Sequence, residues 1–178
     1  RLDSSVGYFN IRGWSTLASA VDEMAESEDS PKVRLLVGMA TRPDEELRQM
    51  LRITGSEAVM DNQTAQRMRE TVLKDLREQL LLGIPSVRDE NTIKTLRRQL
   101  HDGHVQVKLH LAHPLHAKLY LCHASDAKDL TVGYVGSSNL TMAGLRTQGE
   151  LNVDVLDQDA TDRLASWFKE RWQDRLSI

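Results

Sequence analysis

The hydrophobic positions of this chain change spacing repeatedly, from every second residue to every third or fourth, which predicts alternating strands and helices. Strand-like stretches cover residues 5–10, 33–37, 105–111, 115–122, 131–135 and 151–155. Helical stretches cover residues 13–25, a segment that begins near 43, 68–80, 90–101 and 160–172. Because helices alternate with strands and several strands are adjacent, we expect an α/β fold with a mixed β-sheet flanked by helices on both faces.

Apolar residues recur on one side of each predicted helix, and these residues are expected to face the sheet. They are Trp14, Leu17, Val21 and Met24, then Met68, Val72, Leu76 and Leu80, then Ile93, Leu96 and Leu100, and finally Leu164, Trp167 and Phe168. The stretch 33–37 is apolar except for one arginine, so we place it in the middle of the sheet.

Length and composition indicate one soluble, cytoplasmic domain. The 178 residues suffice for a core without disulfides, and the single cysteine, Cys122, is expected to be an inert core thiol. No apolar run is long enough to cross a membrane. The chain opens without methionine and enters strand-like sequence at once, so we interpret residues 1–178 as a single domain excised from a longer chain.

The net charge of −3 argues against binding nucleic acid through overall charge, so any phosphate site must be local. A local positive bias precedes the central strands. Its members, Arg88, Lys94, Arg97, Arg98 and Lys108, either line a groove that leads to such a site or form a solvated face, and the solvated face is the simpler interpretation for most of them.

The chemistry of the chain is concentrated between residues 116 and 139. Alternation along a strand puts His116, Lys118 and Tyr120 on one side, and Ala117 and the following leucines on the other. Ser137 and Asn139 continue the parity of Val135 in the next strand, so they are expected to reach the same place. A nucleophile, a fixed cation and two neutral donors would then converge.

All six histidines, at positions 101, 104, 110, 113, 116 and 123, fall in one window, which suggests either a metal site or a nucleophile. Three of them are spaced by three residues, which suits a helix, yet the sequence there resembles a strand and contains Pro114. No set of carboxylates accompanies them at fixed offsets. We therefore favour a histidine nucleophile over zinc or manganese, and expect no metal and no cofactor.

The stretch from His116 resembles the signature of the phospholipase D superfamily: His-x-Lys, four residues, Asp, six residues, then Gly-Ser and an asparagine. His116, Lys118, Gly136, Ser137 and Asn139 match as they stand. Counting forward from the lysine, the aspartate position holds His123, whereas counting back from Gly136 it holds Asp129. An insertion of six residues in a loop spanning 122–128 reconciles the two counts.

Two further stretches extend the resemblance. Gly149-Glu150 is similar to the acidic residue that follows the family asparagine. Gly7-Tyr8-Phe9, followed by Gly13-Trp14, resembles the start of nuclease-like members attached to bacterial helicases.

The resemblance implies a metal-independent phosphodiesterase in which His116 attacks phosphorus, Lys118, Asn139 and Ser137 bind the phosphoryl oxygens, and Glu150 orients His116. Family members use two motifs and this chain has one, so the resemblance implies a homodimer. DNA is the expected substrate, and a helicase or restriction-type protein the expected parent chain. Ser138, Tyr120 and Asp129 remain open candidates for the site.

Two other functions stay open at this point. One is a catalytically silent nucleic-acid-binding or dimerisation module that keeps the phosphate pocket. The other is a lipid-cleaving or phosphatidyl-transferring enzyme, against which the low aromatic content and the lack of an amphipathic membrane-facing segment argue.

Overall fold

The computed structural model describes residues 1–24, 31–38, 86–110, 112, 115–124, 130–147 and 149–178, together with 70, 73, 74, 77 and 78. Several predictions lie outside the described residues. They concern the helix start near 43, the stripe of Met68, Val72, Leu76 and Leu80, and the positions of His113 and Asp129.

The described elements form a six-stranded sheet with the strand order β3-β2-β1-β4-β5-β6. In chain order they are β1 (Leu2–Val6), α1 (Ile11–Glu23), β2 (Val33–Val37), α4 (Val87–His101), β3 (Val105–Leu109), β4 (Leu119–His123), β5 (Thr131–Gly136), the π-helical turn η1 (Ala143–Thr147), β6 (Asn152–Val155) and α5 (Gln158–Trp172). β1, β2 and β3 are parallel to one another, whereas β4, β5 and β6 join by antiparallel pairing. The predicted mixed sheet is confirmed.

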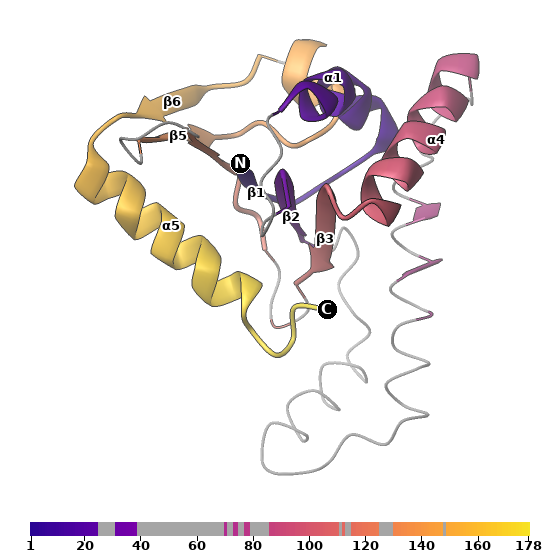
Figure 1. The fold of residues 1–178 in the computed structure, drawn as a ribbon. Coiled ribbons are helices and arrows are strands. Elements are labelled where there is room, and N and C mark those ends of the chain that lie inside the picture. The colour runs from indigo at the N-terminus through magenta and orange to yellow at the C-terminus, as the bar shows by residue number, and fades with distance from the viewer. Residues whose placement is uncertain are drawn as a thin grey trace.

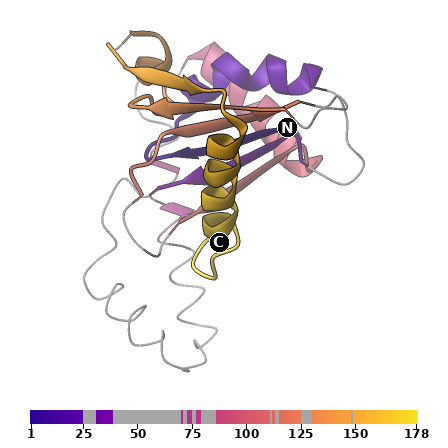
Figure 2. The same cartoon turned by 90° about the vertical axis from the view of Figure 1, so that its left-hand side faces the viewer.

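Helices cover both faces of this sheet, as predicted. α1 and α4 lie side by side on one face, and α5 crosses the other (Figures 1 and 2). Side-chain oxygens cap all three helices: Asn10 accepts from Gly13 N, Ser86 from Asp89 N and Asp157 from Ala160 N. These caps explain why α4 and α5 begin two or three residues before the apolar periodicity that predicted them.

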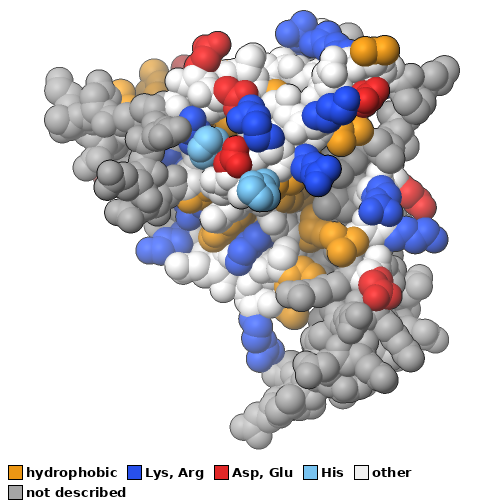
Figure 3. All heavy atoms as spheres, turned by 45° about the vertical axis from the view of Figure 1, so that its right-hand side comes forward, with side chains coloured by type: hydrophobic (Ala, Val, Ile, Leu, Met, Phe, Trp, Pro, Cys, Tyr) orange, Lys and Arg blue, Asp and Glu red, His pale blue; other side chains and the backbone are white. Residues whose placement is uncertain are grey.

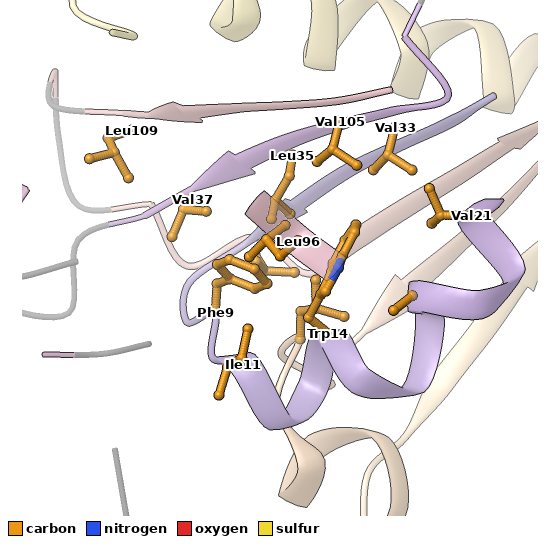
Figure 4. Packing of buried hydrophobic residues seen from close by; sticks show 13 residues of the cluster. Phe9, Ile11, Trp14, Val21, Val33, Leu35, Val37, Leu96, Val105 and Leu109 are labelled. Atoms are coloured by element: carbon orange, nitrogen blue, oxygen red, sulfur yellow. The ribbon is translucent and has the colours of Figure 1, made fainter. Parts of the chain in front are cut away.

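The larger core cluster lies between the sheet and the α1–α4 pair (Figure 4). Trp14 is fully buried there, with its ring edge-on to Phe9 at 6.0 Å, and its Nε1 donates to Gln99 Oε1 at 3.0 Å. The prediction for α1 is confirmed. For α4 it is only partly right, because Ile93 and Leu100 are 40% and 42% exposed, and a polar residue, Gln99, is buried in their place.

The second cluster lies under α5 and contains the alternate residues of β4. Leu119 and Leu121 are buried with Phe168, and Ala117 packs against them. This face also buries a charged group, because Asp3 accepts from Arg34 Nε and Nη2 at 2.6 Å each. The Arg34 guanidinium also lies 5.2 Å from the centre of the Phe168 ring, so both the Asp3 carboxylate and this ring stabilise its charge.

Three strands differ from the prediction by more than one residue at an end, and β5 and β6 differ by one. β1 begins at Leu2 instead of residue 5, because Asp3, Ser4 and Ser5 are buried although they are polar. β4 begins at Leu119, where the pairing with β1 starts, so 115–118 precede the strand. β3 ends at Leu109.

The prediction for Cys122 is wrong, since this residue is exposed. It lies on β4 on the same side as Tyr120, at the end of the strand remote from Leu119. Its position within β4 also means that any loop insertion begins after His123.

Candidate functional site

The candidate site lies where β1 and β2 end, β4 begins and β5 ends. Val6 pairs with Val37, Ser5 pairs with Leu119, and Leu119 pairs with Val135, so these termini share one edge of the sheet. The chain after β2 passes very close to the approach to β4, because a Cβ on Gly38 would collide with the carbonyl oxygen of Leu115. Only glycine allows this approach, and the segment carrying His116 depends on it.

Lys118 and Tyr120 lie on one side of their segment, as predicted, while the direction of the His116 imidazole stays a prediction. Ala117 packs into the α5 cluster, whereas Tyr120 packs against the α1–α4 cluster. His116 is exposed and Lys118 is half-buried, so the imidazole is accessible to solvent.

The Lys118 ammonium and the Asn139 amide meet above Gly7. A Cβ on Gly7 would lie 3.3 Å from Asn139 Oδ1 and 3.7 Å from Lys118 Nζ. Lys118 Nζ donates to the carbonyl of His116 at 2.8 Å, and Tyr8 N donates to Asn139 Oδ1 at 2.9 Å. The second bond fixes the orientation of the amide, because it occupies the oxygen and leaves the Nδ2 donors for a ligand.

The route by which Asn139 reaches this place differs from the prediction. Val135 pairs with Leu119, whose side chain faces α5, so Val135 faces away from Lys118. β5 ends at Gly136, and the turn that follows, not strand parity, carries Asn139 across.

Ser137 is held by the start of β6 and not by the lysine. Its Oγ accepts from Leu151 N at 3.1 Å and donates to Leu151 O at 3.4 Å. The neighbouring Ser138 is buried and exchanges hydrogen bonds with the side chain of Asn152. Gly136 allows β6 this close, since a Cβ there would collide with Leu151 O and Asn152 Oδ1.

Glu150 lies close enough to Tyr120 for its charge to affect the phenol. Burial, with a contribution from the Glu150 charge, raises the pKa of Tyr120. No hydrogen bond between Glu150 and His116 occurs among the described residues, so the orienting role of Glu150 stays a prediction.

The first of the two counted aspartate positions lies at the opposite end of β4. His123 Nε2 is 2.8 Å from Asp3 Oδ2, and His123 Nδ1 is 3.1 Å from Thr131 Oγ1. A carboxylate therefore stands next to this position, although it comes from β1. Hydrogen bonds from Arg34 and His123 outweigh the effect of burial and lower the pKa of Asp3 from its usual 3.8 to about 2.

Three of the basic residues before the site are held by contacts away from it. Lys94 pairs with Glu90 at 2.6 Å and Arg98 with Asp22 at 2.5 Å, while Lys108 donates to Trp172 O on the α5 face. Figure 3 shows lysine and arginine side chains mixed with acidic ones on the face it presents. The solvated-face interpretation therefore holds for Lys94 and Arg98, whereas Lys108 is half-buried against Trp172.

The described residues contain no group of three or more His, Cys, Asp or Glu side chains arranged to hold a metal ion. Within the same part of the chain, no helix combines the length and apolar character that a membrane crossing requires.

Sequence reasoning missed three groups, two at this site and one at the opposite end of β4. The backbone N–H of Tyr8 was invisible to it, since any residue but proline supplies that group. Asn152, on the edge strand, resembled an ordinary solvated amide. The pair of Asp3 and Arg34 could have been inferred from the sequence. Each of two central strands has a charged residue near its start, and two charges buried in this way are expected to pair.

Comparison with known proteins agrees with this geometry. The family described as cardiolipin synthase, PLD-like domain, matches residues 6–172. Because the match covers most of the chain, the protein belongs to this phospholipase D-like family, which supports phosphodiester hydrolysis in general. A search of curated proteins finds no match.

Proposed function

We propose that this chain is a metal-independent phosphodiesterase that cleaves DNA, as the nuclease module of a larger helicase or restriction-type protein. The observation that carries the proposal is that the Lys118 ammonium and the Asn139 amide both lie above Gly7, with the ammonium bound to the backbone carbonyl of the exposed His116. A cation and an oriented amide donor suit the oxygens of a phosphoryl group, and the imidazole supplies a nucleophile beside them.

The reaction proceeds in two displacements. A neutral nitrogen of His116 attacks phosphorus, the P–O bond to the leaving group breaks, and a phosphohistidine forms. A second histidine gives its proton to the leaving oxygen, then takes a proton from water as that water attacks phosphorus and releases His116. Lys118 and Asn139 stabilise the phosphoryl oxygens in both steps, with Ser137 at the rim and Glu150 fixing the tautomer of His116.

The second histidine comes from a second copy of the chain. His110 is buried and hydrogen-bonded to Ser177, and His123 is bound to Asp3 at the other end of β4. Neither is therefore suited to protonate a leaving group next to His116. A symmetric dimer with facing sites provides the partner subunit's His116 instead, so a dilute monomer is expected to be inactive.

Phosphatidyl transfer is the second candidate, because the matching family is described as cardiolipin synthase, PLD-like domain. The same two displacements apply, with the hydroxyl of a second lipid replacing water. A silent binding module is the third outcome.

One assay separates these candidates. Labelled single- and double-stranded DNA and phosphatidylglycerol vesicles are incubated with the protein in excess chelator, and acid-stable and alkali-stable phosphoprotein are quantified. Alkali-stable, acid-labile label on the protein with DNA as donor supports the proposal. Label from lipid alone favours the transferase, and binding without label or cleavage favours the silent module.

Lys118→Met is expected to lower the rate of DNA cleavage by roughly a hundredfold, because it removes the charge that stabilises the phosphoryl oxygens in the transition state. Lys94→Met is the matched control, since Lys94 is an exposed lysine paired with Glu90 on α4. Initial rates for both variants, with thermal unfolding beside them, check the prediction. Equal rates in the two variants would remove Lys118 from the mechanism.

A further inference from the structure

Tyr120 occupies the same side of its segment as Lys118 and makes a polar contact that the proposed mechanism does not use. Its hydroxyl donates to the carbonyl oxygen of Ser138 at 3.0 Å, while its ring packs against the α1–α4 core cluster. Because burial and the nearby charge of Glu150 raise the pKa of this phenol, the hydroxyl stays protonated and remains a donor throughout the neutral pH range.

Ser138 is held from a second direction by β6. Asn152 Nδ2 donates to Ser138 Oγ at 2.7 Å, and Ser138 N donates to Asn152 Oδ1 at 3.5 Å. Ser138 is only 3% exposed, so water does not compete well for these groups. The carbonyl that Tyr120 binds belongs to the peptide group that joins Ser138 to Asn139. A hydrogen bond that holds this peptide in place therefore also holds the Cα of Asn139, from which the side chain extends.

We propose that Tyr120 is a positioning residue for Asn139, which it holds, through the Ser138 peptide, at the angle that presents the amide donors to a phosphoryl oxygen. This inference rests on the proposed function, because it identifies the residue that holds Asn139 in place to bind a phosphoryl oxygen. The other end of Asn139 is already fixed, since its Oδ1 accepts from Tyr8 N and its backbone oxygen accepts from Thr141 N at 2.8 Å. The hydrogen bond from Tyr120 restrains the Ser138 peptide, which precedes Asn139 in the turn.

Tyr120→Phe removes the hydroxyl and keeps the ring, and Tyr134→Phe is its matched control. Tyr134 stands directly opposite Tyr120 on β5, is 42% exposed, and its hydroxyl makes no hydrogen bond among the described residues. Because one hydrogen bond to the backbone is lost, we expect Tyr120→Phe to lower kcat for DNA cleavage about tenfold. KM should change by less than about threefold, since the interaction strengthens in the transition state. Tyr134→Phe should match the wild type in both.

Binding of inorganic phosphate, followed through the side-chain amide signals of Asn139 in NMR spectra, gives a readout independent of turnover. Tyr120→Phe should shift these signals and weaken phosphate binding by up to about threefold, the same limit as for KM, while thermal unfolding shows that the fold is kept. If the wild type binds phosphate at Asn139 but cleaves nothing, the proposed function fails and the positioning role is still tested by this titration. Unchanged kcat and unchanged phosphate binding in Tyr120→Phe would overturn the inference, as would equal losses in Tyr134→Phe or no phosphate effect on Asn139 in the wild type.

Discussion

Replacing His116 with alanine is expected to lower the rate of DNA cleavage by roughly a thousandfold or more, because it removes the proposed nucleophile. The fold should be unaffected, since the His116 side chain is exposed and its carbonyl, which holds Lys118 Nζ, is retained in alanine. Cleavage rates in excess chelator and the yield of phosphoprotein check both parts of the prediction.

The control for this experiment is His101→Ala. His101 lies at the end of α4 with its side chain 88% exposed, so its loss changes neither the core nor the site. A His101→Ala protein should cleave at the wild-type rate. If His116→Ala retains cleavage and still forms phosphoprotein, the nucleophile lies elsewhere. A mixture of His116→Ala with an active chain should also show less activity per active chain if the proposed dimer forms, because each mixed dimer would lack one of its two histidines.

The second large effect concerns stability. Asp3→Asn is expected to lower the free energy of unfolding by about 3 kcal/mol, because it leaves the Arg34 guanidinium in a largely buried place without its carboxylate. Asp3 is 1% exposed and accepts both hydrogen bonds of the guanidinium at 2.6 Å. The melting temperature of a chain of this size should fall by roughly 6–12 °C. Asp154→Asn, on the exposed edge strand, is the control and should melt as the wild type does.

The same carboxylate predicts how stability depends on pH. Since the pKa of Asp3 falls from 3.8 to about 2 on folding, the native state holds the ionised form more strongly. Its contribution of about 2 kcal/mol is complete above the usual pKa and is lost as the pH falls through the folded value. The wild type should therefore lose stability between roughly pH 4 and pH 2 more steeply than Asp3→Asn does. Parallel curves from urea unfolding would contradict this assignment.

Sequence reasoning located the elements well where apolar spacing reflects burial. β2 was placed with its observed bounds, and Trp14 and Val21 face the core as their spacing indicated. It failed where polar groups are buried in pairs. The start of β1 was missed because the burial of Asp3 depends on Arg34, a residue on another strand. The inward face of α4 was predicted only in part because Gln99 is buried against Trp14. Such pairs are visible only once both partners are placed.

For the candidate site, the motif identified side chains but not their mutual support. His116 and Lys118 could be assigned to one side of a strand because alternation is a local property. The approach of Asn139 depends on the turn after Gly136 and on the backbone of Tyr8, which are brought together only by the pairing of β1 with β4. Gly38 and Gly136 indicated in the sequence that another segment comes close to the backbone at these positions, but not which segment it is.

The central position of β1 has a consequence for the order of folding. This first strand is hydrogen-bonded to β2 on one side and to β4 on the other, so its second partner follows more than a hundred residues later. Until β4 docks, Asp3 lacks His123, and Tyr8 N lacks the amide oxygen of Asn139. Closing such a long loop is slow, because its entropy is lost before the contacts form. The proposed phosphate site should therefore appear in refolding only with the final, slow phase, after the parallel β1–β2–β3 unit has formed.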